Sequence, residues 1–248
     1  MHPDTSHWRS KEKYDYLDSL PPEGLAWEFL RRNENYQREF NSHKQRRKVD
    51  ADKKWGLRFF SDPRHSAADQ PIYWSPSADP AVLIMTATPD EFDSNELLDI
   101  PVFAARKSAR TLQVVSVVGD LTFNVIYVAG SKPGDPCAAL IPIDGQCLSR
   151  IEALTRLWRA LQGQSVPPDT RMTLQQRRRI KLMIQAIDGH ADNATYRQIA
   201  EVIYEASRVA SDAWKTSSLR DSTIALVRDG KAMIASEYRQ LLQHRRRS

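Results

Sequence analysis

The period of the hydrophobic pattern changes along this chain, and the change limits the folds that the chain can adopt. Two runs rich in β-branched residues, Leu112 to Val118 and Leu121 to Val128, are joined by Gly119-Asp120. Because glycine readily takes the positive φ of a two-residue turn, this pattern predicts a β-hairpin. From Cys147 to Gln162 the apolar residues instead recur with helical spacing. The sequence therefore predicts an α+β fold.

The region around the hairpin carries two further strand signals. An apolar run from Ala81 to Thr88 is bounded by prolines, and another extends from Ala138 to Ile143. Short apolar runs between turn residues are typical of strands. We therefore expect a middle region that contains β-structure, with the hairpin as its clearest element.

The N-terminal segment, residues 8–43, has a helical pattern with a turn at Pro21-Pro22. Between Gly24 and Phe40 the apolar side chains share one helical face, which predicts N-terminal helices. The basic stretch from His43 to Lys54 that follows indicates a solvated helix end or linker, with a phosphate-contacting arm as the alternative. Charged side chains lie away from the apolar face, at Glu28, Arg31, Arg32 and Glu34.

A linker separates the last third of the chain from the rest. Residues 163–169 include Pro167-Pro168, which stop a helix, among polar neighbours. We therefore divide the chain into three parts. Residues 1–54 form an N-terminal helical segment, 55–165 an α+β middle region for assembly or regulation, and 169–248 a C-terminal all-α domain.

Four helical patterns follow the linker. Their order predicts a helix-turn-helix domain, in which the second helix supports the third and the third enters the major groove of DNA. Thr195 and Gln198 have the spacing of a capping box, and Thr216 or Ser217 can cap the third helix. The patterns run from Thr173 to a C-cap at Gly189, from Thr195 to Ala206, from Thr216 or Ser217 to Gly230, and from Lys231 to Gln243.

Positive charge is concentrated in this C-terminal part. The whole chain has a net charge of +5, but residues 171–248 alone contain 15 Lys and Arg against 8 Asp and Glu. Such asymmetry favours a polyanionic partner, and together with the helical order it predicts binding to double-stranded DNA. The terminal run from Arg245 to Arg247 would add non-specific attraction to phosphates.

The third helical pattern supplies the candidate contacts. Arg220 is the first candidate for a base edge, because a guanidinium can donate two hydrogen bonds to guanine. Lys215, Ser217 and Ser218 suit phosphates at the free N–H groups of a helix start. The remaining candidates are Thr216 and Arg228 on the same helix, and Arg177, Arg178, Arg179 and Arg197 for the flanking DNA backbone.

Several short motifs occur in a fixed order. The chain contains Thr195-Tyr196-Arg197-Gln198-Ile199-Ala200, Trp214-Lys215, Leu219-Arg220-Asp221, Leu226-Val227-Arg228-Asp229-Gly230 and Tyr238-Arg239-Gln240-Leu241-Leu242. These motifs resemble the DNA-binding domain of the RovC-like bacterial transcription factors. The N-terminal residues Trp27-Glu28-Phe29-Leu30-Arg31-Arg32-Asn33, with Tyr36, are similar to the regulator-like module that often precedes that domain.

The resemblance implies an activator of type VI secretion genes that assembles as a homo-oligomer, with a hexamer as the expected form. The partners that it implies are promoter DNA and, as a further contact, RNA polymerase. Related regulators include antiactivators, so a regulator that acts through protein contacts without binding DNA is the alternative. Lys215, Arg220 and Arg228 weigh against that alternative, because they make the third helix basic.

Other function classes lack their residue patterns. The six histidines form no paired metal-ligand spacing, and no glycine begins a phosphate-binding loop. His65 near Asp62 and Ser66, and the acidic stretch 90–96, are interpreted as surface loops. Cys137 and Cys147 are too few for a disulfide framework. We therefore expect no enzyme activity, no cofactor, no membrane span and no export signal, and hence a cytoplasmic protein.

Overall fold

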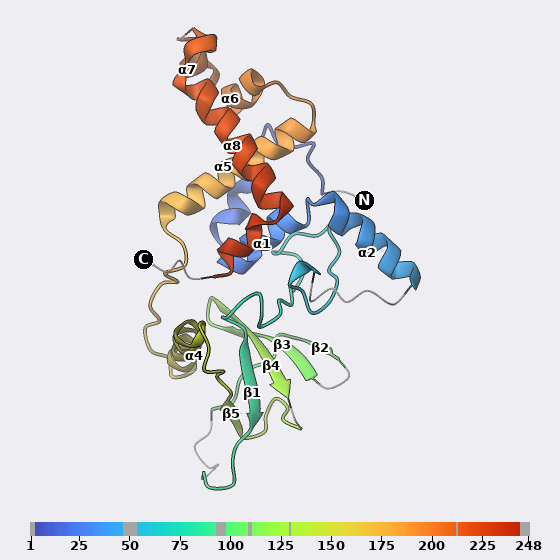
Figure 1. The fold of residues 1–248 in the computed structure, drawn as a ribbon. Coiled ribbons are helices and arrows are strands. Elements are labelled where there is room, and N and C mark those ends of the chain that lie inside the picture. Colours follow the sequence, from blue (N-terminus) through green and yellow to red (C-terminus); the bar gives the residue numbers. More distant parts are fainter. Residues whose placement is uncertain are drawn as a thin grey trace. The chain divides into compact units, whose positions relative to one another are not determined.

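The chain folds into two compact units. The computed structural model describes residues 3–46, 54–92, 98–108, 111–128, 130–211 and 213–243. The first unit is built from residues 1–49, 61–70 and 170–241, and the second from residues 50–60, 71–169 and 242–248. Helices at both ends of the chain and a sheet in the middle confirm the α+β class (Figure 1). No helix in the described ranges is long and apolar enough to span a bilayer.

The second unit contains a five-stranded sheet of order β2-β3-β4-β1-β5. β1 and β4 are parallel, and the other neighbouring strands are antiparallel. The predicted hairpin is confirmed, because β3 and β4 pair along their full length and Gly119 has a φ of 59°. The strands are β1 (Leu83–Ala87), β2 (Ala104–Lys107), β3 (Thr111–Val118), β4 (Leu121–Val128) and β5 (Cys137–Ala139).

Helix α4 (Cys147–Leu161) packs against this sheet, as its helical spacing predicts. On the face of α4 that contacts the sheet, Leu157 is buried, and Ala153, Leu154 and Ala160 lie around it partly buried. The strands contribute buried apolar side chains from alternate positions. These are Leu83, Met85, Val114, Phe123, Val125 and Tyr127.

The first unit is helical, and it brings distant parts of the sequence into one core. The N-terminal helices pack against α5 and α8, and α5 packs against α6 and α8. Its elements are η1 (Lys11–Asp18), α1 (Pro22–Leu30), α2 (Glu34–Arg46), α5 (Leu174–Ala191), α6 (Tyr196–Tyr204), α7 (Ala206–Ala210), η2 (Trp214–Thr216), α8 (Ser218–Ala235) and η3 (Glu237–Leu241).

Two N-terminal features differ from the helical pattern. The predicted single helical face from Gly24 to Phe40 is divided between two helices, α1 and α2. The Asn33 side chain accepts hydrogen bonds from the backbone N–H groups of Asn35 and Tyr36, and it therefore caps the start of α2. In addition, every residue of α1 is buried. The expected charged outer face of α1 is therefore wrong, because other elements of the first unit cover it.

The buried charges of α1 are paired. The Glu28 carboxylate accepts hydrogen bonds from Arg31 Nε at 2.6 Å and from an Arg32 nitrogen at 2.9 Å. Arg32 also binds Asp188 of α5 through two nitrogens at 2.8 Å, and Tyr14 of η1 donates to the same carboxylate at 2.8 Å. Burial alone would raise the pKa of Glu28, but the charges of Arg31 and Arg32 outweigh it and lower this pKa. The network therefore joins α1 to α5 through ionised side chains and η1 to α5 through the Tyr14 hydroxyl.

Two glycines predicted at helix ends lie inside helices instead. Gly189 falls within α5 and Gly230 within α8, so α8 continues past the predicted break. A Cβ at Gly189 would lie 2.9 Å from the Trp8 ring, and one at Gly230 would lie 2.5 Å from Ile187 Cγ2. Both glycines therefore serve close packing rather than chain termination, which a sequence pattern cannot distinguish.

Gly230→Ala is expected to lower the free energy of unfolding by about 1–2 kcal/mol. Overpacking against Ile187 costs about 1–3 kcal/mol, and the better helix propensity of alanine returns less than about 1 kcal/mol. Urea unfolding followed by circular dichroism measures the difference. Adding Ile187→Leu, which moves the branch point away from Cβ, should restore part of the loss. A Gly230→Ala variant as stable as wild type would contradict the close contact.

Candidate nucleic-acid interface

The N-terminal half of α8 lies at one end of the first unit, beside α6 and α7 (Figure 1). Thr223, Leu226 and Val227 form its buried face, while Leu219 is partly buried. Residues 205–217 connect α6 to α8 and contain α7 and η2. This connection is longer than the three or four residues that join the two helices of the common motif.

The start of α8 combines a cap with exposed polar side chains. Ser217 is 5% exposed, and its hydroxyl accepts a hydrogen bond from the Leu219 N–H at 3.2 Å. Its side chain therefore caps the helix, as one of the two predicted caps, instead of pointing outward. Lys215, Thr216 and Ser218 are exposed around it. Remaining N–H groups of a first helical turn, together with a nearby cation, favour an anion such as phosphate.

Both arginines predicted on α8 reach solvent next to an acidic neighbour. Arg220 lies 3.3 Å from an oxygen of Asp221, and the side chain of Arg228, 75% exposed, lies 2.8 Å from Asp229. Asp229 also accepts a hydrogen bond from Arg179 at 2.5 Å. Partial burial would raise the pKa of Asp229, but hydrogen bonds from both arginines lower it. Exposed pairs of this kind are weak, so the guanidinium groups can exchange them for DNA.

The remaining arginines of the predicted set have different surroundings. Arg178 is exposed, and Arg197 forms an exposed pair with Glu201 on the next turn of α6. Arg177 instead donates hydrogen bonds to the backbone carbonyls of Leu17 and Leu20. Its guanidinium therefore fastens the chain around η1 to α5.

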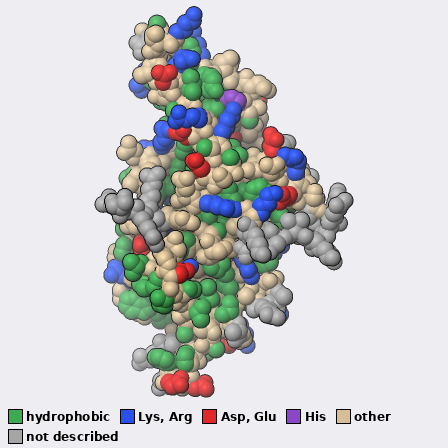
Figure 2. Space-filling view, viewed as in Figure 1, with side chains coloured by type: hydrophobic (Ala, Val, Ile, Leu, Met, Phe, Trp, Pro, Cys, Tyr) green, Lys and Arg blue, Asp and Glu red, His purple; other side chains and the backbone are tan. Residues whose placement is uncertain are grey.

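The positive charge of residues 171–248 is partly balanced by the N-terminal segment. Arg171 pairs with Glu23 at 2.9 Å, with both side chains largely buried. Lys181 contacts Asp15 and Asp18, each at 2.6 Å. The charge asymmetry along the sequence therefore does not describe the surface of the folded unit. Figure 2 shows Lys and Arg side chains at the end of the unit that carries α7, with acidic side chains among them.

Arg208 is a further basic residue at this end, outside the predicted set. It lies on α7 and is exposed. Burial raises the pKa of Tyr204, while a hydrogen bond with Ser222 and the charges of Arg179 and Arg208 lower it. Both arginines therefore lie near Tyr204. We therefore add Arg208 to the candidate interface. No sequence signal marks this residue, because its position depends on the formation of α7.

The other predicted features carry no chemistry of their own in the described ranges. No cluster of three His, Cys, Asp or Glu side chains there could hold a metal ion. Cys137 and Cys147 are free thiols, and the partial burial of Cys137 raises its pKa. In the loop around His65, Asp62 pairs with Arg64 at 2.5 Å. Most of the basic stretch, residues 93–96 of the acidic stretch and the run from Arg245 to Arg247 lie outside the described residues.

Two parts of the chain match known protein families. Residues 140–243 match the RovC DNA-binding domain, described as the DNA-binding domain of a type VI secretion system transcription factor. Residues 7–60 match the proteobacterial transcriptional regulator-like domain. The chain is a RovC-like regulator. In this RovC-like regulator the DNA-binding match includes α4 as well as α5 to η3. No curated protein matches the chain.

Proposed function

We propose that this RovC-like regulator activates type VI secretion genes by binding promoter DNA as a homo-oligomer. The observation that carries the proposal is the capped start of α8, with Lys215, Ser218 and Arg220 around it, in a segment that matches a DNA-binding domain. Arg220 reads a base edge, and Lys215 and Ser218 contact phosphates. DNA as its target would place its action in the cytoplasm.

Paired half-sites in promoter DNA favour a symmetric oligomer, and a hexamer is the form that the family resemblance favours. Activation would require a contact with RNA polymerase. Arg178, Arg179, Arg197 and Arg228 would hold the DNA backbone beside the base contact, and Arg208 joins them. Thr216 would lie at the edge of the contact, while Ser217 and Arg177 would support it from within the fold.

A second function is an adaptor or antiactivator that binds another regulator instead of DNA. One observation favours it: Arg197, Arg220 and Arg228 each have an acidic partner, which leaves this surface less basic than the sequence indicates. The two functions differ in their dependence on salt and on single arginines. The next two predictions separate them.

Arg220→Ala is expected to weaken binding to a cognate promoter fragment by about 1–3 kcal/mol and to relax base preference at one position. The loss follows from removing a bidentate donor at the start of α8. Fluorescence anisotropy with cognate and scrambled duplexes measures both effects. Arg64→Ala, which removes an exposed arginine from the loop that follows α2, is the matched control and should change little. Unchanged affinity and base preference in Arg220→Ala would contradict the base contact.

The affinity for promoter DNA is expected to fall steeply with salt. The logarithm of the association constant should fall with the logarithm of salt concentration with a slope of about −0.9 per phosphate contacted. Lys215→Ala should reduce the size of this slope by about one, without changing sequence preference. Anisotropy titrations between low and physiological salt measure the slope. A flat response would favour the adaptor function.

A further inference from the structure

Helix α4 carries large apolar side chains on an inner and an outer face. The inner face, with Leu157 fully buried, packs on the sheet. On the outer face Leu148 is 81%, Ile151 43% and Trp158 47% exposed. A helix that is apolar on both sides is usually buried on both sides. We therefore expect the outer face to pack against another surface. The described part of this chain does not supply that surface.

The spacing of the outer face is that of a helix seam. Leu148, Ile151, Thr155 and Trp158 follow one another at intervals of three and four residues, so they form one stripe along α4. At 3.6 residues per turn the centre of this stripe lies about 140° around the helix from the centre of the inner face, on the side of Leu154. Regular seams of this kind pack against a second helix, because each side chain fits between side chains of the facing helix.

Thr155 is the one polar side chain within the stripe between Leu148 and Trp158, and its polarity is already satisfied. Its hydroxyl donates a hydrogen bond to the Ile151 carbonyl of the same helix at 2.9 Å. Covering Thr155 would therefore leave no unsatisfied hydroxyl donor, which is the usual obstacle to burying a polar group. The stripe can be covered along its whole length by an apolar surface.

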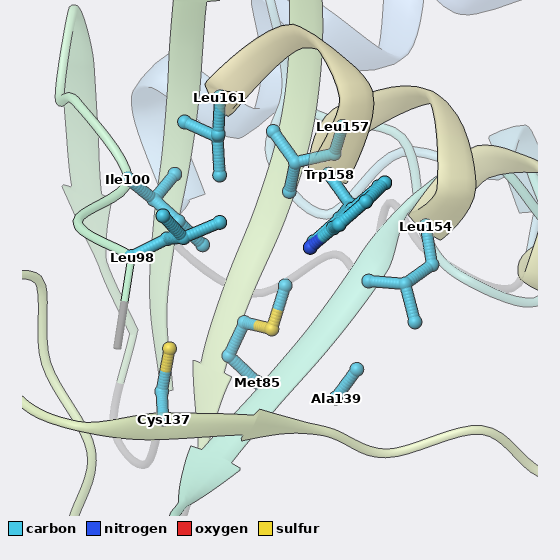
Figure 3. A pocket seen from close by; sticks show the side chains of 9 residues that line it. All are labelled: Met85, Leu98, Ile100, Cys137, Ala139, Leu154, Leu157, Trp158 and Leu161. Carbon is cyan, nitrogen blue, oxygen red and sulfur yellow. The ribbon is translucent and has the colours of Figure 1, made fainter. Parts of the chain in front are cut away.

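A cavity beside the stripe extends the apolar surface. It has a volume of about 250 Å³ and lies between α4 and the sheet edge. Figure 3 shows Trp158 at this cavity, with Leu154 and Leu161 of α4 on either side and Met85 and Cys137 below. Because Trp158 belongs to both the cavity and the stripe, one occupant can cover both.

The charges beside the stripe identify the occupant. Glu152 and Arg159 lie on the same flank of α4, seven residues apart and on either side of Thr155. In an antiparallel pair of identical helices, the same flank of both helices comes together. A two-fold axis near Thr155 then brings Glu152 of each copy opposite Arg159 of the other. The stripe is thus complementary to itself in charge as well as in apolar character.

We propose that α4 of one chain packs antiparallel on α4 of a second chain, about a two-fold axis near Thr155. The proposal rests on the proposed homo-oligomer and names one of its interfaces. Ile151 and Trp158 form the apolar centre of the contact. Glu152 and Arg159 fix its direction, since in a parallel two-fold pair the two charged flanks lie on opposite sides of the contact and no Glu152–Arg159 pair forms.

Cross-linking of a cysteine at the axis tests the proposal. Thr155→Cys in the full chain, treated with a short bismaleimide, should form a covalent dimer in high yield on a denaturing gel. Gln164→Cys, beyond the C-terminal end of α4 where the two copies are far apart, is the matched control. Wild type under the same treatment gives the background from Cys137 and Cys147. A cross-linking yield at position 155 no higher than this background overturns the proposal.

Charge reversal tests the direction of the pair. Glu152→Arg alone and Arg159→Glu alone should each weaken self-association at least about tenfold, because like charges then face each other. The double variant should restore it. Sedimentation velocity measures the association constant, and circular dichroism checks the fold. Leu174→Glu on α5, another exposed leucine, should leave assembly unchanged. A double variant that stays as weak as the single variants contradicts the antiparallel pair.

The outcomes also separate this interface from the proposed function. A chain that oligomerises and binds DNA, without cross-linking at position 155, uses another interface, and the α4 pair is wrong while the proposed function stands. A chain that is monomeric at every concentration overturns both the α4 pair and the proposed oligomer, but not DNA binding. Binding of the apolar probe N-phenyl-1-naphthylamine to wild type, without self-association, would show that a small ligand occupies this surface instead.

Discussion

Asp188→Ala is expected to lower the free energy of unfolding of the first unit by about 3–5 kcal/mol, the usual cost of leaving one partner of a buried ion pair uncompensated. The Asp188 side chain is 3% exposed and holds Arg32 Nε at 2.8 Å. It also accepts a hydrogen bond from Tyr14 at 2.8 Å. Without this carboxylate, Arg32 keeps Glu28 alone as an ionised partner. Urea unfolding at neutral pH measures the loss.

Two variants show whether the loss comes from charge or from shape. Asp188→Asn keeps an acceptor oxygen but removes the charge, so its loss should lie between wild type and Asp188→Ala. Glu201→Ala breaks the exposed pair with Arg197 and should cost less than about 1 kcal/mol. A loss in Asp188→Ala as small as that in Glu201→Ala would show that the network contributes little to stability.

Local order along the chain could be predicted from the sequence. The hairpin at Gly119, helix α4 and the capping box at Thr195 and Gln198 each depend on a few neighbouring residues, and all three form as predicted. The short edge strand β2 was missed, because most of its side chains are exposed and it shows no alternation of apolar and polar residues. Local signals therefore identify elements that have a buried face or a cap.

Long-range packing could not be predicted. Arg32 was expected on a charged face away from the core, because its partner, Asp188, lies 156 residues away in the sequence. Gly230 was predicted to end a helix. It is instead inside α8, where Ile187 lies too close to leave room for a side chain, and the sequence pattern does not show that contact. Each of these errors came from a contact between distant segments, which periodicity does not record.

The same limit applies to the candidate interface. The stretch from Lys215 to Arg228 was predicted as a recognition helix, and its N-terminal cap and buried face are present. Its use in DNA binding stays a prediction. Charge counted along the sequence overstated how basic the surface is, because Glu23, Asp15 and Asp18 fold back onto Arg171 and Lys181.

The N-terminal segment is expected to be required for the DNA-binding domain to fold. Trp8 is 1% exposed, and its indole donates a hydrogen bond to Asp192 at 2.8 Å. Its backbone carbonyl accepts one from Gln185 of α5, and Asn33 donates to the Ile234 carbonyl of α8. Losing a buried tryptophan alone costs about 3–5 kcal/mol, against a total domain stability of about 5–15 kcal/mol.

A fragment of residues 140–243, the matched DNA-binding segment alone, should therefore show no cooperative urea transition. Its promoter affinity should fall at least about 100-fold, which corresponds to about 2.7 kcal/mol. Adding a separate fragment of residues 1–70 should restore both properties, because it supplies the N-terminal part of the first unit. The same fragment with Trp8→Ala should restore them less. If residues 140–243 fold alone and bind with full affinity, the shared core is not needed for DNA binding, and the N-terminal segment serves regulation only.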